Sequence, residues 1–383
     1  MKLFSCECCA QPLFFENTRC ESCHHEVGYL HKLADLTALN PAEEPGKWYP
    51  MEPGLEDQVH VYCANRQYDA CNWLLGPQEA AEGPYCYACQ FNRTIPDLSD
   101  PHNLERWRKI EVAKHRLFHA LIRLDLPMVN RRQDPENGLA FDFLDDAPDG
   151  SAPVMTGHDN GLITLAVREA DDDQRERMRV EMGEYYRTLL GHFRHEIGHY
   201  FWNVLIRDGG RLKRCRAVFG DDRQDYQAAL EAHYAKPPSE DWRETHVSVY
   251  AASHPWEDFA ETWAHYLHIV STLETAWLYG IAIAPQTPEA AQYSTPALSG
   301  NPYRTLGFDE IMNAWLPLSM AVNSLNRSMG LQDFYPFVLT GAIRQKLAFI
   351  HDVIRETQQS RDAQRQDQSE RAALTMSEGH AAE

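Results

Sequence analysis

Nine of the ten cysteines lie within the first 89 residues, and this crowding limits the N-terminal part to a fold built around thiol groups. The chain begins without the long apolar core of a secretion signal, so we expect a cytoplasmic protein whose thiols stay reduced. Metal binding is then favoured over disulfides. Two Cys-x-x-Cys knuckles with a short spacer predict a tetrahedral zinc site in a ribbon hairpin. Its predicted ligands are Cys6, Cys9, Cys20 and Cys23.

Three further residues lie close to these knuckles in the sequence. Cys8 is an extra thiol, and a register in which it serves as a ligand stays open. His24 and His25 directly follow the second knuckle. Four thiolates already complete the coordination of the metal, so we expect both histidines at the surface.

A second group of cysteines follows, with a less regular spacing. Cys86 and Cys89 form a third knuckle, whereas Cys63 and Cys71 are too far apart to form one. Four cysteines in so short a segment still favour a second zinc site with four cysteine ligands. The alternative is a set of buried free thiols, which behave as small hydrophobic side chains.

The charge of the chain argues against nucleic acid and membrane partners. It has 36 Lys and Arg against 56 Asp and Glu, which gives a formal net charge of −20. Residues 1–100 alone carry six basic and 15 acidic side chains. A surface that neutralises phosphates needs the opposite sign. No apolar run reaches the roughly 18 residues that a membrane-spanning helix needs. We therefore expect no nucleic acid and no membrane as partner.

The order of the patterns predicts a zinc-ribbon module over 1–100, a mostly helical domain over 101–358 and a disordered tail over 359–383. Residues 93–102, rich in Pro and Asp, are typical of the exit from the first module. Short β-prone runs between turns predict a small sheet within 138–168. Hydrophobic spacing predicts helices at about 103–125, 225–235, 254–278, 307–329 and 336–358. The helical pattern over 171–206 is too long for one ordinary helix and suggests a break near Gly183 or Gly191.

A His-Glu-x-x-His motif lies within this long helical pattern. His195 and His199 are one helical turn apart, so both imidazoles reach a single zinc ion. Glu196 lies beside that face and can take a proton from a metal-bound water. His192 lies one turn earlier, but a catalytic zinc must keep a position open, so we interpret His192 as a neighbour of the site.

The third ligand must come from a later segment, and residues 254–265 are the richest in candidates. Glu257 and Glu261 share one face of the predicted helix that starts at 254. If Glu257 binds the zinc, Glu261 can accept the free N–H of a ligand histidine. Asp258 points away from this face. His265 lies on the same stripe and is the best substitute ligand.

These motifs resemble the gluzincin metallopeptidases. In that family a helix after His-Glu-x-x-His supplies a Glu ligand and, four residues later, an acidic partner; the string from Glu257 to Glu261 is similar to this helix in the anthrax lethal factor family. The same resemblance implies that Tyr250, seven residues before Glu257, lies near the zinc. No Asn-Glu-x-x-x-Asp string of the thermolysin-like members is present.

Over residues 3–355 the chain resembles bacterial zinc-binding metallopeptidases with an N-terminal zinc ribbon. We expect an α+β, mostly helical, zincin-like fold with a small sheet behind a ribbon module. The predicted function is peptide-bond hydrolysis, with Glu196 as general base, Tyr250 as oxyanion donor and one catalytic plus one or two structural Zn²⁺ ions. The strand near 161–167 is expected to pair with an extended peptide or protein substrate. The alternatives are a non-catalytic adaptor that binds proteins through its ribbons, and hydrolysis of a non-peptide amide.

Overall fold

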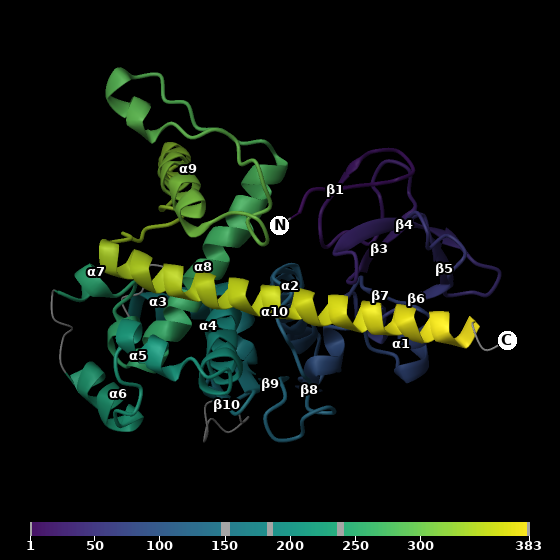
Figure 1. Ribbon diagram of the computed structural model, residues 1–383, viewed down its shortest axis with the longest axis horizontal. Coiled ribbons are helices and arrows are strands. Elements are labelled where there is room, and N and C mark those ends of the chain that lie inside the picture. The colour runs from purple at the N-terminus through teal and green to yellow at the C-terminus, as the bar shows by residue number, and fades with distance from the viewer. Residues whose placement is uncertain (1, 147–153, 182–186, 236–240, 381–383) are drawn as a thin grey trace.

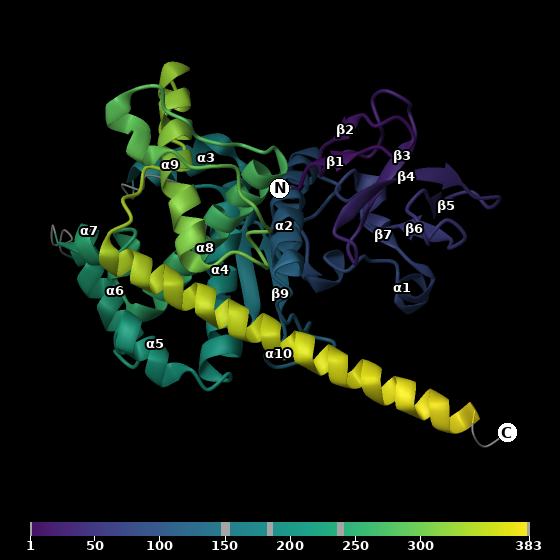
Figure 2. The same cartoon turned by 45° about the horizontal axis from the view of Figure 1, so that its top comes forward.

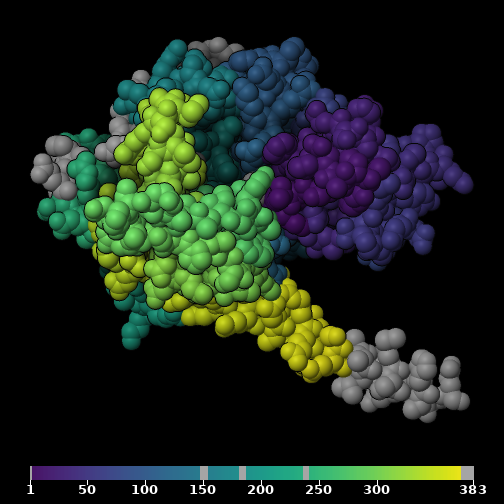
Figure 3. All heavy atoms as spheres, turned by 90° about the horizontal axis from the view of Figure 1, so that it is seen from above, coloured from purple at the N-terminus to yellow at the C-terminus, as the bar shows by residue number. Residues whose placement is uncertain are grey.

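The computed structural model describes residues 2–146, 154–181, 187–235 and 241–380. Strands fill the part before residue 95, and helices dominate the part that follows (Figure 1). In the space-filling view these two parts form adjoining lobes (Figure 3). One continuous cluster of buried hydrophobic side chains runs through both lobes. Among the described residues, no helix is both long and apolar enough to cross a bilayer.

The N-terminal lobe consists of two antiparallel sheets. A two-stranded hairpin, β1-β2, precedes a five-stranded sheet of order β3-β4-β5-β6-β7. The lobe contains β1 (Phe4–Ser5), β2 (Pro12–Leu13), β3 (Glu26–Leu30), β4 (Asp35–Pro41), β5 (Lys47–Pro50), β6 (His60–Tyr62), η1 (Ala64–Tyr68), β7 (Leu74–Leu75), α1 (Pro77–Glu82) and η2 (Cys89–Phe91). Gly28 in β3 lets Leu74 pack directly on the backbone, because an added Cβ would lie 2.6 Å from its side chain.

The sheet predicted within 138–168 is present and contains two strands that the sequence did not reveal. Its order is β10-β11-β9-β8, from β8 (Asn92–Thr94), β9 (Ala140–Leu144), β10 (Gly157–Asp159) and β11 (Leu162–Ala166). Strand β8 comes from the segment read as an exit from the ribbon and pairs parallel to β9. Strand β11 is flanked on both sides, so the expectation that 161–167 offers a free edge is wrong. The edge strands of this sheet are β10 and β8.

The second lobe is built around α2, α4 and α8, which pack against one another. The helices predicted from about 103, 225, 254 and 307 are confirmed as α2, α6, α8 and α9. The lobe contains α2 (Pro101–Arg123), η3 (Val167–Ala170), α3 (Asp172–Glu181), α4 (Leu189–Phe201), the π-helical η4 (Trp202–Arg207), α5 (Leu212–Phe219), α6 (Tyr226–Ala235), α7 (Trp242–Thr245), η5 (Tyr250–Ala252), α8 (Pro255–Leu278), η6 (Pro288–Tyr293), α9 (Phe308–Ser328) and α10 (Gly341–His380).

The predicted break in the long helical pattern falls between α3 and α4. Gly183 lies outside the described residues. Gly191 lies inside α4 and causes no break. Helix α4 begins after Thr188, whose side chain accepts a hydrogen bond from the backbone N–H of Gly191 at 3.0 Å.

The structure differs from the prediction of a disordered tail over 359–383. Helix α10 continues to His380, and its C-terminal part projects from the body (Figure 2). The tail is poor in apolar residues, but its Gln, Arg, Ala and Glu residues favour helix, and the packed turns before it supply the nucleus. Arg371 pairs with Asp367 one turn earlier, at 3.1 Å. The last three residues lie outside the described part of the chain.

Candidate metal centres

The close packing of α4 on α8 brings the predicted catalytic residues together. Gly198, inside the His-Glu-x-x-His motif, faces α8 so closely that an added Cβ would lie 3.0 Å from the Cα of Ala260. At the start of α8, the His254 side chain accepts the backbone N–H of Trp256 at 3.1 Å, and Pro255 occupies the first turn. The first turn of α8 therefore faces the histidines of α4.

Three predicted ligands converge at this contact. The Nε2 atoms of His195 and His199 lie 3.2 Å apart. Glu257 Oε2 lies 2.9 Å from His195 Nε2 and 3.4 Å from His199 Nε2. Ligand atoms about 2.1 Å from a tetrahedral zinc lie roughly 3.4 Å from one another. The spacing of the three atoms therefore fits a single zinc ion.

The chemistry of the three residues also fits a cation. Glu257 Oε2 is buried, and within the described part of the chain it has no hydrogen-bond partner beyond the two imidazole nitrogens that it faces. Burial lowers the pKa of His195, but hydrogen bonds to Glu257 and Glu261 outweigh it and raise the pKa well above the usual value. Burial alone would raise the pKa of Glu257. The nearby His199 and His195 outweigh burial, and the pKa of Glu257 lies well below its usual value. The pocket thus stabilises positive charge, which a proton or a metal ion can supply.

Glu261 lies where the sequence analysis expected it. Its Oε1 accepts a hydrogen bond from His195 Nδ1 at 2.7 Å, which turns Nε2 of that ring toward Glu257. Its Oε2 accepts the Ser248 hydroxyl at 2.6 Å. The burial of Glu261 raises its pKa, but His195 outweighs this and lowers the pKa to about 2. Glu261 is therefore ionised, and its carboxylate holds His195 in place.

Glu196 is buried on α4 between the two histidines in sequence. Burial raises the pKa of its carboxyl group, and the nearby His195 and His199 oppose that shift. Tyr250 lies in η5, with its ring centroid 5.8 Å from that of His195. Burial and the charge of Glu257 raise the pKa of Tyr250, so its hydroxyl keeps its proton at neutral pH.

The other histidine candidates are engaged outside the metal site. His192 Nδ1 contacts the carboxylate of Glu169, a buried residue in η3 that the sequence analysis missed. His265 is buried, and its Nδ1 lies 2.7 Å from the hydroxyl of Tyr335, so it is no substitute ligand in this arrangement. Asp258 points away as expected and pairs with Lys346 of α10 at 2.6 Å.

Three more residues of the site have no signature in the motifs. The Tyr226 hydroxyl donates to Glu257 Oε1 at 2.7 Å and leaves Oε2 facing the histidines. The ring of Trp256 lies on His199 with centroids 3.8 Å apart, and His158 of β10 stacks on the same imidazole at 5.9 Å. Their only sequence signal is position: two of them lie next to predicted helix starts.

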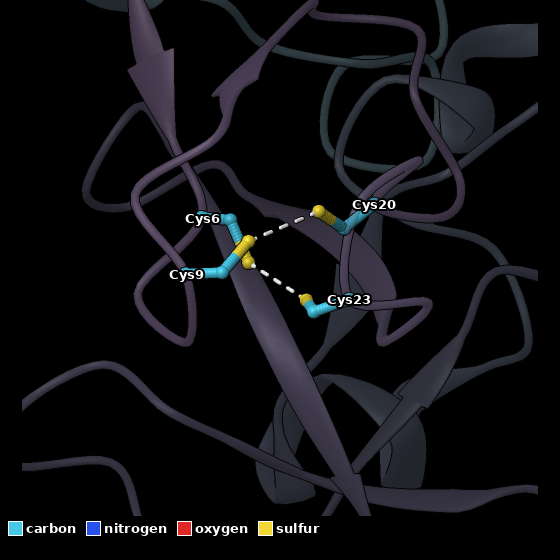
Figure 4. Close-up of side chains that lie close together, drawn as sticks. All are labelled: Cys6, Cys9, Cys20 and Cys23. Atoms are coloured by element: carbon cyan, nitrogen blue, oxygen red, sulfur yellow. Dashed lines mark hydrogen bonds between the residues drawn. The ribbon is translucent and has the colours of Figure 1, made fainter.

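The first cysteine cluster forms at the hairpin, as predicted. Its four Sγ atoms all lie within 4.8 Å of one another (Figure 4). The two closest pairs join the knuckles, Cys6 to Cys23 at 3.5 Å and Cys9 to Cys20 at 3.6 Å. The arrangement of four sulfur atoms suits a tetrahedral metal ion.

Three further residues, Cys8, His24 and His25, lie beside this cluster. Cys8 is exposed, and it also groups with Cys23 and His25 as a set that could hold a metal. His24 is exposed as expected. His25 is half-buried, and its Nδ1 lies 3.3 Å from the Cys23 sulfur, so it reaches the surface and also contacts the cluster. The turn after the second knuckle folds back over the thiol.

The second cysteine cluster also assembles, but in the interior. Cys63, Cys71, Cys86 and Cys89 are all buried, with sulfur atoms within 4.8 Å of one another. Backbone N–H groups donate to two of the sulfurs, at 3.4 Å each. On the helical side, His115 Nε2 of α2 lies 3.5 Å from Cys71 Sγ and 3.6 Å from Cys89 Sγ.

Comparisons with known proteins agree with this arrangement. Residues 103–353 match the family described as "Putative zinc-binding metallo-peptidase", and residues 3–100 match a zinc-ribbon domain. Uncharacterized proteins of Mycobacterium bovis and Mycobacterium tuberculosis are 42% identical over 358 residues, which is 93% of this chain and 96% of theirs. No solved structure matches the chain. The chain belongs to this family of zinc-binding metallo-peptidases and carries a zinc-ribbon domain in front of the region that defines it.

Proposed function

We propose that this protein is a zinc-dependent peptidase of the gluzincin type, with one zinc ion held by His195, His199 and Glu257. The convergence of their three ligand atoms, within 3.4 Å of one another, carries the proposal. A zinc ion bound there lowers the pKa of water from 15.7 to about 7 and polarises a carbonyl oxygen. Three protein ligands leave room for water and substrate, as in catalytic zinc sites.

Glu196 is the proton carrier of the proposed reaction. Its carboxylate takes one proton from the attacking water and delivers it to the nitrogen of the leaving amine. Burial raises its pKa toward the range in which both transfers are easy. A purely structural metal site has no need of such a base, which favours catalysis over an adaptor role.

Tyr250 is the proposed donor to the oxyanion that forms as the water attacks the carbonyl group. Its proton is retained at neutral pH, and its ring lies beside His195. Such a donor contributes roughly 3 kcal/mol to transition-state stabilisation. Tyr226 has a different role, because its hydroxyl is already bound to Glu257 and orients that carboxylate.

Strand β10 is the proposed docking edge for the substrate backbone. It is an outer strand of its sheet, it contacts α4, and His158 within it stacks on His199. An extended peptide added there runs past the metal ligands and pairs with backbone groups on the outer side of β10. The proposed substrates are therefore peptides or unfolded protein segments.

The first test is Glu196→Ala, assayed with a peptide library and by zinc analysis. We expect zinc content to be unchanged and cleavage to fall by about 100-fold or more, the usual size of a general-base effect. The exposed Glu105→Ala is the matched control and should cleave normally. Full activity of the Glu196 variant refutes the mechanism, and no cleavage by the unaltered protein favours the adaptor alternative.

The second test separates the ligand Glu257 from its neighbour Glu261. Glu257→Gln removes the carboxylate that faces both imidazoles. This variant should therefore lose zinc from the site at a lower chelator concentration than either the unaltered protein or Glu261→Gln. Glu261→Gln weakens only the hydrogen bond to His195 and should lower zinc affinity by about 10-fold. Zinc analysis after dialysis measures both. Unchanged zinc in the Glu257 variant places the ligand elsewhere.

A further inference from the structure

The second cysteine cluster lies at the junction of the two lobes. Its cysteines come from the ribbon, but one wall is formed by α2 of the helical lobe, through His115. The two residues that flank this wall, Glu111 and Lys114, are fully buried and paired at 2.8 Å. The first cluster differs, because its nearest ring nitrogen, on His25, belongs to the ribbon itself.

The chemistry of this wall suits a metal-bound thiolate cluster. Four thiolates around Zn²⁺ carry a net charge of −2, and a buried charge of that size needs donors and cations nearby. The imidazole of His115 lies within reach of two sulfur atoms and can donate its Nε2 proton to them. The Lys114 ammonium group, fully buried close by, supplies positive charge.

Helix α2 also touches both helices that carry the catalytic ligands. It packs along α4. One turn after His115, His119 Nε2 lies 3.4 Å from Glu274 of α8, and Arg123 donates to the same carboxylate at 3.0 Å. A shift of α2 would therefore displace α8, whose first two turns hold Glu257 and Glu261.

A row of aromatic rings forms a second connection. Phe91, two residues after Cys89, packs on Phe118 of α2 with centroids 5.0 Å apart. Phe118 packs on Phe141 of β9 at 6.0 Å, and Phe141 on Phe193 of α4 at 5.7 Å. Phe193 lies two residues before His195, and all four rings are fully or almost fully buried. Closely packed interiors transmit displacements of this kind rather than absorb them.

We propose that the second cluster is a metal site shared by the two lobes, in which His115 donates to the metal-bound sulfurs, and that its occupancy raises the affinity of the His195–His199–Glu257 site for zinc. The inference rests on the proposed zinc at that site but not on hydrolysis. His115 acts as a positioning residue in this scheme. The peptidase then binds its catalytic metal tightly only when the ribbon is loaded.

The test compares His115→Leu, His115→Gln and His25→Leu in the full chain, across a series of buffered zinc concentrations. Protection of Cys71 and Cys86 from alkylation, read by mass spectrometry, reports the second cluster. The decrease in total zinc per chain that Glu257→Ala causes in each background reports the catalytic site. We expect His115→Leu to weaken the second cluster by about 10-fold and the catalytic site by about 5-fold or more. His115→Gln keeps an N–H donor at this position and should retain the zinc affinity of both sites.

His25→Leu is the matched control, because it removes an imidazole beside the first cluster. It should leave both reported sites unchanged. Unchanged protection of Cys71 in His115→Leu overturns the shared site. Weakened protection with an unchanged catalytic site, or equal effects from His25→Leu, overturns the coupling. Failure of the proposed catalytic site is distinguishable, because Glu257→Ala would then not alter total zinc in the unsubstituted background.

Discussion

The two cysteine clusters have the same four ligands but opposite surroundings. The first lies in two neighbouring turns of the ribbon, with Cys9 exposed and Cys23 only half-buried, and the imidazole beside it, on His25, belongs to the same lobe. The second is buried on all sides and borders a helix of the other lobe. The comparison shows that equal coordination chemistry does not imply an equal structural role. The surroundings decide how much of the molecule depends on the metal.

The largest expected difference is between Cys86→Ser and Cys9→Ser. A structural zinc contributes about 10–16 kcal/mol in small zinc-finger domains, which is comparable to the whole stability of a typical domain. We expect Cys86→Ser to abolish cooperative unfolding of the entire chain, whereas Cys9→Ser should disorder the hairpin and leave the helical lobe intact. Circular dichroism melting with zinc analysis measures both. Equal losses of stability in the two variants would remove the distinction.

The second difference concerns charge at the junction. Lys114→Met deprives the buried Glu111 of its ammonium partner at 2.8 Å, and breaking a buried ion pair costs about 3–5 kcal/mol. Lys32→Met is the control, because Lys32 forms an exposed pair with Glu79 at 3.0 Å and should change stability by under about 1 kcal/mol. Urea denaturation monitored by fluorescence gives both values. The idea of a charge-dependent junction fails if the Lys114 variant is as stable as the control.

The smallest difference concerns one hydroxyl group between the lobes. Tyr29 of β3 is fully buried, and its hydroxyl lies 2.8 Å from His119 Nδ1 of α2. Tyr29→Phe should cost about 1–2 kcal/mol, because it leaves the buried imidazole with an unmet partner. Tyr85→Phe, at an exposed position, should change nothing measurable. Thermal unfolding resolves the pair, and identical melting temperatures would show that this contact is dispensable.

Residues with a fixed spacing in one segment were the easiest to predict. The knuckles, the His-Glu-x-x-His motif and the Glu257/Glu261 pair each follow from one helix or one hairpin, and the structure brings their members together. Tyr226 and Glu169 were missed because their partners lie on other helices, at separations that no periodicity encodes. For the same reason, His115 on α2 gave no hint of its nearness to the second cluster.

Element boundaries failed where composition and context disagree. Residues 359–380 are poor in apolar side chains, yet they continue a helix that was already nucleated. Strand β8 lies in a segment punctuated by Pro and Asp, and only its partner β9, far along the chain, makes it a strand. Long-range pairing of this kind leaves little trace in local sequence.

Strand β8 has a practical consequence for anyone who dissects this protein. It lies before residue 100, yet it completes the sheet of the helical lobe, and Arg93 within it donates to the buried Asp142 of β9 at 2.9 Å. A truncated chain beginning at Pro101 would expose the flank of β9 and remove the Arg93 guanidinium group from Asp142. Such a fragment should aggregate through that bare flank. The ribbon and the helical lobe are therefore best expressed, purified and engineered as one piece.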